Sequence, residues 1–359
     1  MHTPTNNELR QIAREFAVAD TRLSIMPYGK GLINDTYLIT LSDKTSQLIL
    51  QRINTAVFPQ PEKLQANIQT LTEFINNNGA AEKRLQIPML KKTRNGRNVY
   101  RDSNNDYWRA MQFIADTHSI ESIASLAQAQ QVGFALGHFH FLLRNMRADS
   151  MYDTLPGFHI TPQYLKHYQQ VTAALKQLPH SPEDNYCRQV ISRHRELAGL
   201  LEQAKHNGQL KTRIIHGDPK INNFLFHNDS GKAVSLIDLD TVKPGLLHYD
   251  IGDCLRSCCQ SRSDPVNFDL EICCTVLEYY FKQTRSLLNS QDYQMLLSAI
   301  KLLPYELGLR FYTDYLQGNR YFKVKSPDQN LQQAVRQFQL LQSIITQQPS
   351  LQKILGKQT

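Results

Sequence analysis

Two short segments in the second half of the chain carry the side chains best suited to chemistry. Residues 213–226 contain Asp218 and, five positions later, Asn223, while Asp238 follows a mostly apolar run. Phosphoryl transfer from ATP needs a carboxylate beside the acceptor hydroxyl. It also needs an amide oxygen and a second carboxylate to hold Mg²⁺ against the nucleotide phosphates. The spacing predicts that Asp218 is the catalytic base and that Asn223 and Asp238 bind Mg²⁺, which prefers oxygen ligands.

Three further charged residues lie close to these positions along the chain. Lys220 is predicted to neutralise the transferring phosphate, with an exposed surface lysine as the alternative. Asp240 shares a face with Asp238 if the chain is extended there, so we expect it to support the metal site or to contact the substrate. Asp250 either braces the loop that carries the base, by accepting hydrogen bonds from its backbone, or caps a helix.

A glycine-containing turn near the N-terminus is the candidate for contact with the ATP phosphates. Gly29 and Gly31 would let backbone N–H groups approach phosphate oxygens, and Asn34 and Thr36 follow in the next expected strand. The segment lacks the third glycine of G-x-G-x-x-G, so an ordinary β-turn is the alternative.

Two other parts of the nucleotide site are expected in the first third of the chain. Arg52 is the candidate cation on the third strand that would hold the α- and β-phosphates. Glu62 or Glu73 on the following helix would pair with it, and the sequence leaves this choice open. Backbone groups at the junction that contains Gln112 and Ile114 would read the adenine edge.

The elements that position these groups follow from the hydrophobic pattern. In the first third we expect helices at 7–19 and 61–77 and strands within 23–40, 46–54, 84–92 and 107–113. From about residue 118 the pattern is helical, interrupted by a hairpin at 213–240. We therefore predict an α+β fold of two lobes, with ATP bound between them. Residues 1–114 would form a small antiparallel sheet plus a helix, and residues 115–359 a mainly helical lobe.

The composition limits the classes of function. The chain has 359 residues, of which 41% are hydrophobic and 20% charged, as is ordinary for a globular protein. We see neither a signal peptide nor an apolar run long enough for a membrane span, and we expect a cytoplasmic protein without a membrane partner. The net charge of +8 is spread along the chain, so no nucleic-acid partner is expected. Both a monomer and a homodimer stay open.

Several segments resemble the aminoglycoside phosphotransferase/choline kinase superfamily, and within it the N-acetylhexosamine 1-kinases. They are residues 31–37, 50–54, 61–68, 216–226, 237–245, 249–256 and 306–322. The run Ile-Asp-Leu-Asp-Thr-Val-x-Pro-Gly at 237–245 is much more specific than the general phosphotransferase motif. The resemblance implies a protein-kinase-like fold. It also implies transfer of phosphate from ATP, with Mg²⁺, to the anomeric 1-hydroxyl of N-acetylglucosamine or N-acetylgalactosamine.

The resemblance also implies which residues surround the acceptor. Arg310 and Tyr321 would contact the sugar; taken without the family, Arg310 is a substrate contact or half of a salt bridge, because an unpaired buried charge is costly. Leu32 and Ser257 stand near the sugar pocket, where the family often has His and an aromatic residue, so they bear on which sugar is preferred.

Two alternatives to a sugar kinase remain open. The first is a kinase of an aminoglycoside, choline or another amino alcohol, whose pocket should be strongly acidic to hold a cation. The second is an inactive nucleotide-binding regulatory module, and the joint presence of Asp218, Asn223 and Asp238 argues against it.

Overall fold

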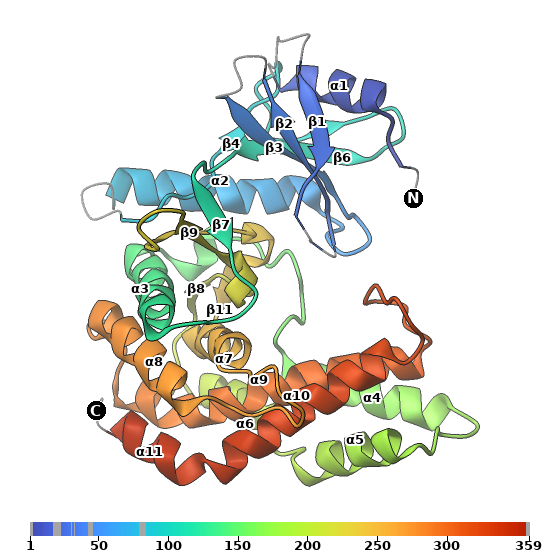
Figure 1. Ribbon diagram of the computed structural model, residues 1–359, viewed down its shortest axis with the longest axis vertical. Coiled ribbons are helices and arrows are strands. Elements are labelled where there is room, and N and C mark those ends of the chain that lie inside the picture. The colour runs from blue at the N-terminus through green and yellow to red at the C-terminus, as the bar shows by residue number, and fades with distance from the viewer. Residues whose placement is uncertain are drawn as a thin grey trace.

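The computed structural model describes residues 3–16, 23–29, 31, 33–41, 46–78 and 84–356. These residues form a small antiparallel sheet near the N-terminus and a larger, mainly helical part, which lie one above the other in Figure 1. The predicted α+β fold class is confirmed, whereas the division between residues 114 and 115 stays a prediction. The helices of the described residues are all too short or too polar to cross a membrane.

The N-terminal sheet has the strand order β1-β2-β3-β6-β4, and β5 also pairs with β6. Its strands are β1 (Ser24–Pro27), β2 (Asp35–Thr40), β3 (Gln47–Ile53), β4 (Leu90–Lys91), β5 (Tyr100–Arg101) and β6 (Tyr107–Gln112). Helix α1 (Asn6–Glu15) starts at a capping box in which Thr5 and Glu8 each accept the other's backbone N–H. Its apolar residues pack on one face of the sheet, around the fully buried Trp108. Helix α2 (Pro61–Asn78) lies between the sheet and the helical part (Figure 1).

The helical part surrounds one large hydrophobic core. Its helices are α3 (Leu126–Leu142), α4 (Thr161–Ala174), α5 (Pro182–Arg193), α6 (Leu197–His206), α7 (Leu247–Cys258), α8 (Leu270–Thr284), α9 (Ser290–Leu316), α10 (Gln329–Thr346) and α11 (Gln348–Gly356). Helices α5 and α6 follow each other closely, since α5 ends at Arg193 and α6 begins at Leu197. Helix α9 continues through Pro304.

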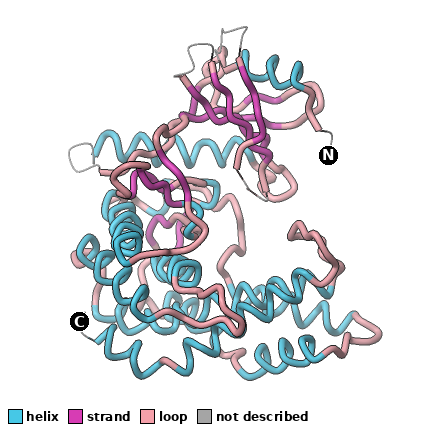
Figure 2. The backbone as a smooth tube through the Cα atoms, in the orientation of Figure 1, coloured by secondary structure: helices cyan, strands magenta, loops and turns pink. Residues whose placement is uncertain are grey.

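Short strands interrupt the helices and are the magenta segments inside the helical part in Figure 2. They are β7 (Thr117–Ser119), β8 (Arg213–Ile215), β9 (Phe224–His227), β10 (Ala233–Leu236) and β11 (Lys243–Gly245). Strand β9 pairs with β10 and β7, and β8 pairs with β11. Phe224, Phe226 and Leu236 are at most 1% exposed. This anchoring in the core fixes two neighbouring turns: η2 (Ile221–Asn223), which leads into β9, and η3 (Leu239–Thr241), which follows β10.

Candidate active site

The loop between β8 and η2 carries Asp218, and it is held from behind by Asp250 on α7. The two carboxylate oxygens of Asp250 accept the backbone N–H groups of His216 at 2.7 Å and Gly217 at 2.8 Å. The interpretation of Asp250 as a brace of this loop is confirmed. Gly217 has φ of +87°, and a Cβ there would lie 2.5 Å from the carbonyl oxygen of Thr241. Only glycine fits this turn, both in conformation and in space.

Two buried histidines extend the support of the loop. His140 on α3 places Nε2 2.8 Å from Asp250 and Nδ1 2.9 Å from the hydroxyl of Tyr280 on α8. His216 Nε2 donates to the carbonyl oxygen of Ile237 at 2.9 Å, which ties the loop to the strand end before Asp238. Burial lowers the pKa of His216. The loop is therefore held directly by α7 and by the end of β10. Helices α3 and α8 support it indirectly, through the contact of His140 with Asp250.

Asp218, Lys220 and Asn223 meet within this loop, as their spacing predicted. Lys220 Nζ is paired with Oδ2 of Asp218. Burial lowers the pKa of Lys220, but the carboxylates of Asp218 and Asp238 outweigh this effect and raise it to about 12. Asn223 donates its Nδ2–H to the Asp218 carbonyl oxygen at 2.7 Å, so that its Oδ1 is the amide oxygen left for a cation.

Asp238 lies just beyond β10 in the left-handed conformation, with φ of +66°. Its recessed position and the negative charge of Asp240 raise its pKa to about 6, although Lys220 acts in the opposite direction. The side chain is nevertheless open to solvent. The negative charge of Asp240 destabilises the ionised form of Asp238, and a bound cation would stabilise it. An accessible carboxylate in such surroundings fits a site for a divalent cation. The described residues contain no cluster of three His, Cys, Asp or Glu side chains that would hold a metal by themselves.

Asp240 joins the helical part to the N-terminal sheet. Its Oδ2 accepts a hydrogen bond from Asn34 Nδ2 at 2.6 Å, and its Oδ1 is paired with the guanidinium of Arg109 on β6. Arg109 also donates to Gln51 Oε1, through Nε at 2.9 Å and Nη2 at 2.7 Å. Asn34, expected at the nucleotide, and Asp240, expected at the metal or the substrate, are therefore bound to each other.

Arg52 does not have the surroundings that were expected. It lies on the face of the sheet opposite Gln51, with its guanidinium 5.9 Å from the centre of the Trp108 ring. Asp35 at 2.5 Å and Asp106 at 3.0 Å pair with it, instead of the helix residues Glu62 or Glu73. Strand pleating explains the correction, since neighbouring residues point to opposite faces.

Arg109 is a buried cation on the other face, paired with Asp240, and it was not among the residues expected at the site. Its Coulombic effect lowers the pKa of Asp238, against the larger raising effects there. One signal in the sequence could have indicated it. Arg109 is a charged residue within the mostly apolar strand expected at 107–113, and a buried charge needs a partner of opposite charge.

The remaining nucleotide candidates are arranged around β1 and the junction after β6. Gly29 has φ of +76°, in the left-handed region. Thr36 Oγ1 accepts a hydrogen bond from Gln51. The ring of Tyr28 packs edge-on against that of Phe113, with ring centres 5.8 Å apart. The Gln112 N–H donates to the Met89 carbonyl oxygen at 2.9 Å, so it is already engaged. The carbonyl oxygen of Ile114 accepts the Thr117 hydroxyl at 2.7 Å. Gly31 belongs to the described residues, whereas Leu32 falls outside them.

Arg310 on α9 lies in a box of aromatic rings. Its guanidinium carbon is 5.0–5.8 Å from the ring centres of Phe158, Tyr164, Tyr321 and Phe322. Burial lowers the pKa of Arg310, but the surrounding tyrosines and Glu306 raise it, with a further contribution from Asp218. Among the described residues no acceptor is found at hydrogen-bond distance from this guanidinium. Tyr321 is 50% exposed and closes one side of the box.

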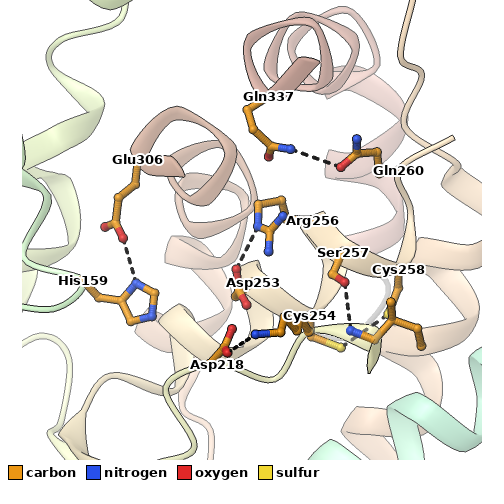
Figure 3. Close-up of polar contacts among 12 residues, drawn as sticks. His159, Asp218, Asp253, Cys254, Arg256, Ser257, Cys258, Gln260, Glu306 and Gln337 are labelled. Atoms are coloured by element: carbon orange, nitrogen blue, oxygen red, sulfur yellow. Dashed lines mark hydrogen bonds and ion pairs between the residues drawn. The ribbon is translucent and has the colours of Figure 1, made fainter. Parts of the chain in front are cut away.

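Helix α7 adds two polar groups beside the base, shown in Figure 3. Ser257 accepts the backbone N–H of Ile221 at 2.8 Å. It therefore contacts the loop at 216–223, the candidate catalytic loop, whereas it was expected near the sugar. Asp253 is 6% exposed; Arg256 donates to its Oδ1 at 2.8 Å, while its Oδ2 has no hydrogen-bond partner among the described residues. Asp253 was missed by the sequence analysis, although a charge on the buried face of a helix is a signal in itself.

The sequence was compared with models of protein families, and the structure was compared with solved structures. Residues 24–271 match the model of the phosphotransferase enzyme family. An aminoglycoside phosphotransferase from Alicyclobacillus acidocaldarius superposes with a TM-score of 0.69 at 15% identity, covering 98% of each chain. A choline kinase from Cryptosporidium parvum gives a TM-score of 0.61 at 14% identity, again covering 98% of each chain.

An amicoumacin kinase, whose structure contains AMP-PNP and Ca²⁺, gives a TM-score of 0.60 at 16% identity and covers 98% of this chain and 96% of its own. At these identities the structures establish a shared fold. The family match is independent of them and spans the strands, the catalytic loop and α7. The chain belongs to the phosphotransferase enzyme family.

Proposed function

We propose that this chain is an ATP-dependent kinase of a small molecule and that its acceptor is the anomeric 1-hydroxyl of an N-acetylhexosamine. The phosphotransferase family supports a kinase in general. The resemblance at residues 237–245 and 306–322 supports the sugar, as N-acetylglucosamine or N-acetylgalactosamine.

The single observation that carries the acceptor class is the surroundings of Arg310. A guanidinium has five N–H donors and no acceptor, so it suits oxygen atoms of a ligand. Its positive charge lies close enough to Asp218 to interact with it, and the described residues offer it no hydrogen-bond acceptor. A sugar hydroxyl or acetamido carbonyl oxygen would satisfy these donors, and the aromatic rings would pack against the apolar faces of the sugar. A cationic acceptor would be repelled.

Each residue of the loop has a role in this proposal. Asp218 accepts a hydrogen bond from the attacking hydroxyl and orients it, since positioning contributes more than basicity in phosphoryl transfer. Lys220 neutralises charge on the transferring phosphate, and Arg109, held by Asp240 and Gln51, adds positive charge behind the metal candidate. Asn223 Oδ1 and Asp238 would hold Mg²⁺, which would neutralise charge on the ATP phosphates. The presence of AMP-PNP and Ca²⁺ in the amicoumacin kinase supports a nucleotide with a divalent cation.

A kinase of an aminoglycoside or choline is the second candidate, and a specific observation supports it. The unpartnered Oδ2 of Asp253 could accept a hydrogen bond from an ammonium group. Against it, positive charge already lies beside this carboxylate: burial raises the pKa of Asp253, but Arg256, His159 and Lys220 outweigh burial and lower it.

The test is ADP formation from ATP with Mg²⁺ in the presence of N-acetylglucosamine, N-acetylgalactosamine, glucose, galactose, kanamycin or choline. Phosphorus NMR of the product would identify an anomeric phosphate. Asp218→Asn is the control, since it keeps the shape of the base and removes its charge. Turnover of kanamycin or choline alone would exclude the sugar and keep the kinase. Tight nucleotide binding without any turnover would favour the regulatory module.

A further inference from the structure

His159 joins the helix that carries Arg310 to the loop that carries Asp218. Its Nε2 lies 2.7 Å from the carbonyl oxygen of Gly217, and its Nδ1 lies 2.9 Å from Oε1 of Glu306. Gly217 directly precedes Asp218, and Glu306 lies one helical turn before Arg310 on α9. Figure 3 shows the imidazole ring between Glu306 and the catalytic loop.

Both ring nitrogens of His159 face oxygen atoms that accept hydrogen bonds. A backbone carbonyl carries no proton, and an ionised carboxylate accepts only. The second oxygen of Glu306 accepts the hydroxyl of Thr161 at 2.6 Å, which favours the ionised form of the carboxylate. Each nitrogen of His159 must then carry a proton, so the geometry fits an imidazolium ion paired with a carboxylate.

The charges around the ring agree with this assignment. Burial lowers the pKa of His159, but the Glu306 carboxylate outweighs burial and raises it, with a smaller contribution from Asp253 on α7. Burial raises the pKa of Glu306, but His159 and Arg310 outweigh burial and lower it. Two tyrosines also lie against this residue: Tyr249 on α7 stacks on the ring, and Tyr164 on α4 is hydrogen-bonded to the His159 backbone.

The position of the ring is tightly defined. His159 has φ of +65°, which is unusual for a residue with a side chain. Its ring stacks on Tyr249 with centres 5.2 Å apart and an angle of 13° between the planes. The ring of the neighbouring Phe158 is tilted by 38° against it, with ring centres 4.1 Å apart. The imidazole therefore has little freedom to rotate away from either acceptor.

We propose that the His159 imidazolium is a positioning residue that aligns the acceptor-binding helix α9 with the catalytic loop. It rests on the proposed function, in which Asp218 orients the hydroxyl and Arg310 binds the acceptor. A neutral ring has one N–H and can donate to Gly217 or to Glu306, but not to both. Loss of the proton would therefore release either the loop or the helix, and the acceptor hydroxyl would no longer be held beside the base.

The pH dependence of kcat/KM tests this role. Because the pKa of His159 is raised, the ring is charged below that pKa, and activity is lost as the pH rises through it. Glu306→Gln keeps the shape of the partner and removes its charge. We expect the alkaline loss of activity to move to lower pH by about 1–3 units, the effect of one nearby opposite charge. His167→Gln, which changes an exposed histidine on α4, should leave the profile unchanged. An alkaline limb that does not move in Glu306→Gln would refute the positioning role.

Nitrogen-15 NMR of the imidazole separates this inference from the identity of the acceptor. The His159 resonances, assigned by comparison with His159→Asn, should show a cationic ring at pH 7 in the wild type without any acceptor, and a neutral ring in Glu306→Gln. This reading stands even when no sugar is phosphorylated, in which case only the proposed acceptor fails. A neutral His159 at pH 7 in the wild type would overturn the inference even if N-acetylglucosamine is a good substrate.

Discussion

Replacing Asp240 by Asn tests whether its pairing with Arg109 holds the sheet to the helical part. The two side chains are 2% and 1% exposed, and Asp240 also accepts a hydrogen bond from Asn34. Asn keeps the shape of the side chain but leaves the Arg109 guanidinium buried without its bonded counter-charge. Removing one partner of a buried ion pair costs about 3–5 kcal/mol. That loss is large beside the roughly 5–15 kcal/mol that stabilises a typical domain.

A double-mutant cycle with Arg109→Gln measures the pairing itself. The double variant has no unpaired buried charge, so we expect it to recover part of the loss, with a coupling free energy of about 2 kcal/mol or more. Urea unfolding should be followed by fluorescence of Trp108, the single tryptophan, which neighbours Arg109 on β6. Circular dichroism would follow the helical part in parallel.

The control for this cycle is the exposed pair Lys282 and Glu278 on α8, which are 46% and 50% exposed. Glu278→Gln should leave the free energy of unfolding almost unchanged, because solvent screens such pairs. If the losses caused by Asp240→Asn and Arg109→Gln add to within about 0.5 kcal/mol, the two side chains do not interact energetically and the reasoning is wrong.

Three further substitutions test the active site. Asp218→Asn should lower kcat by about 10²–10⁴-fold, as for loss of a general base, while calorimetry shows unchanged AMP-PNP affinity. Unchanged turnover would remove Asp218 from the mechanism. Arg310→Ala should raise the KM of the acceptor more than the KM of ATP. Arg285 is exposed on the surface, so the control variant Arg285→Ala should change neither KM. Equal effects of Arg310→Ala on both KM values would contradict the acceptor role. Gly217→Ala should destabilise the protein by about 1–3 kcal/mol in urea unfolding, because the new Cβ meets the carbonyl oxygen of Thr241 and the backbone is strained; a wild-type midpoint would contradict this.

The geometry of the loop that carries Asp218 was predictable from the sequence because it is local. Asp218 and Asn223 lie in one turn, and the hydrogen bond between Asn223 Nδ2 and the Asp218 carbonyl oxygen spans only five residues. The strands on either side are apolar runs that enter the core, so their pattern marks the turn between them. The bracing role of Asp250 was also proposed correctly, as one of two options.

The identity of the cation beside the metal candidate depended on the tertiary structure. Gln51 and Arg52 are neighbours in sequence, but pleating sends them to opposite faces of the sheet, and only the packing of α1 shows which face is covered. Arg109 reaches Asp240 across 131 positions of the chain. No local pattern encodes such a contact.

The sequence alone determined the residue types, the spacing of the catalytic loop and the α+β character of the fold, because each depends on neighbours within one element or turn. The tertiary structure decided which charges are paired. His159 contacts Gly217 and Glu306, which lie 58 and 147 residues away from it in the sequence. Ser257 accepts a hydrogen bond from Ile221, which lies 36 residues away. A buried charge takes whichever partner the packing of distant helices brings within about 3 Å, and that choice is made only when the chain has folded.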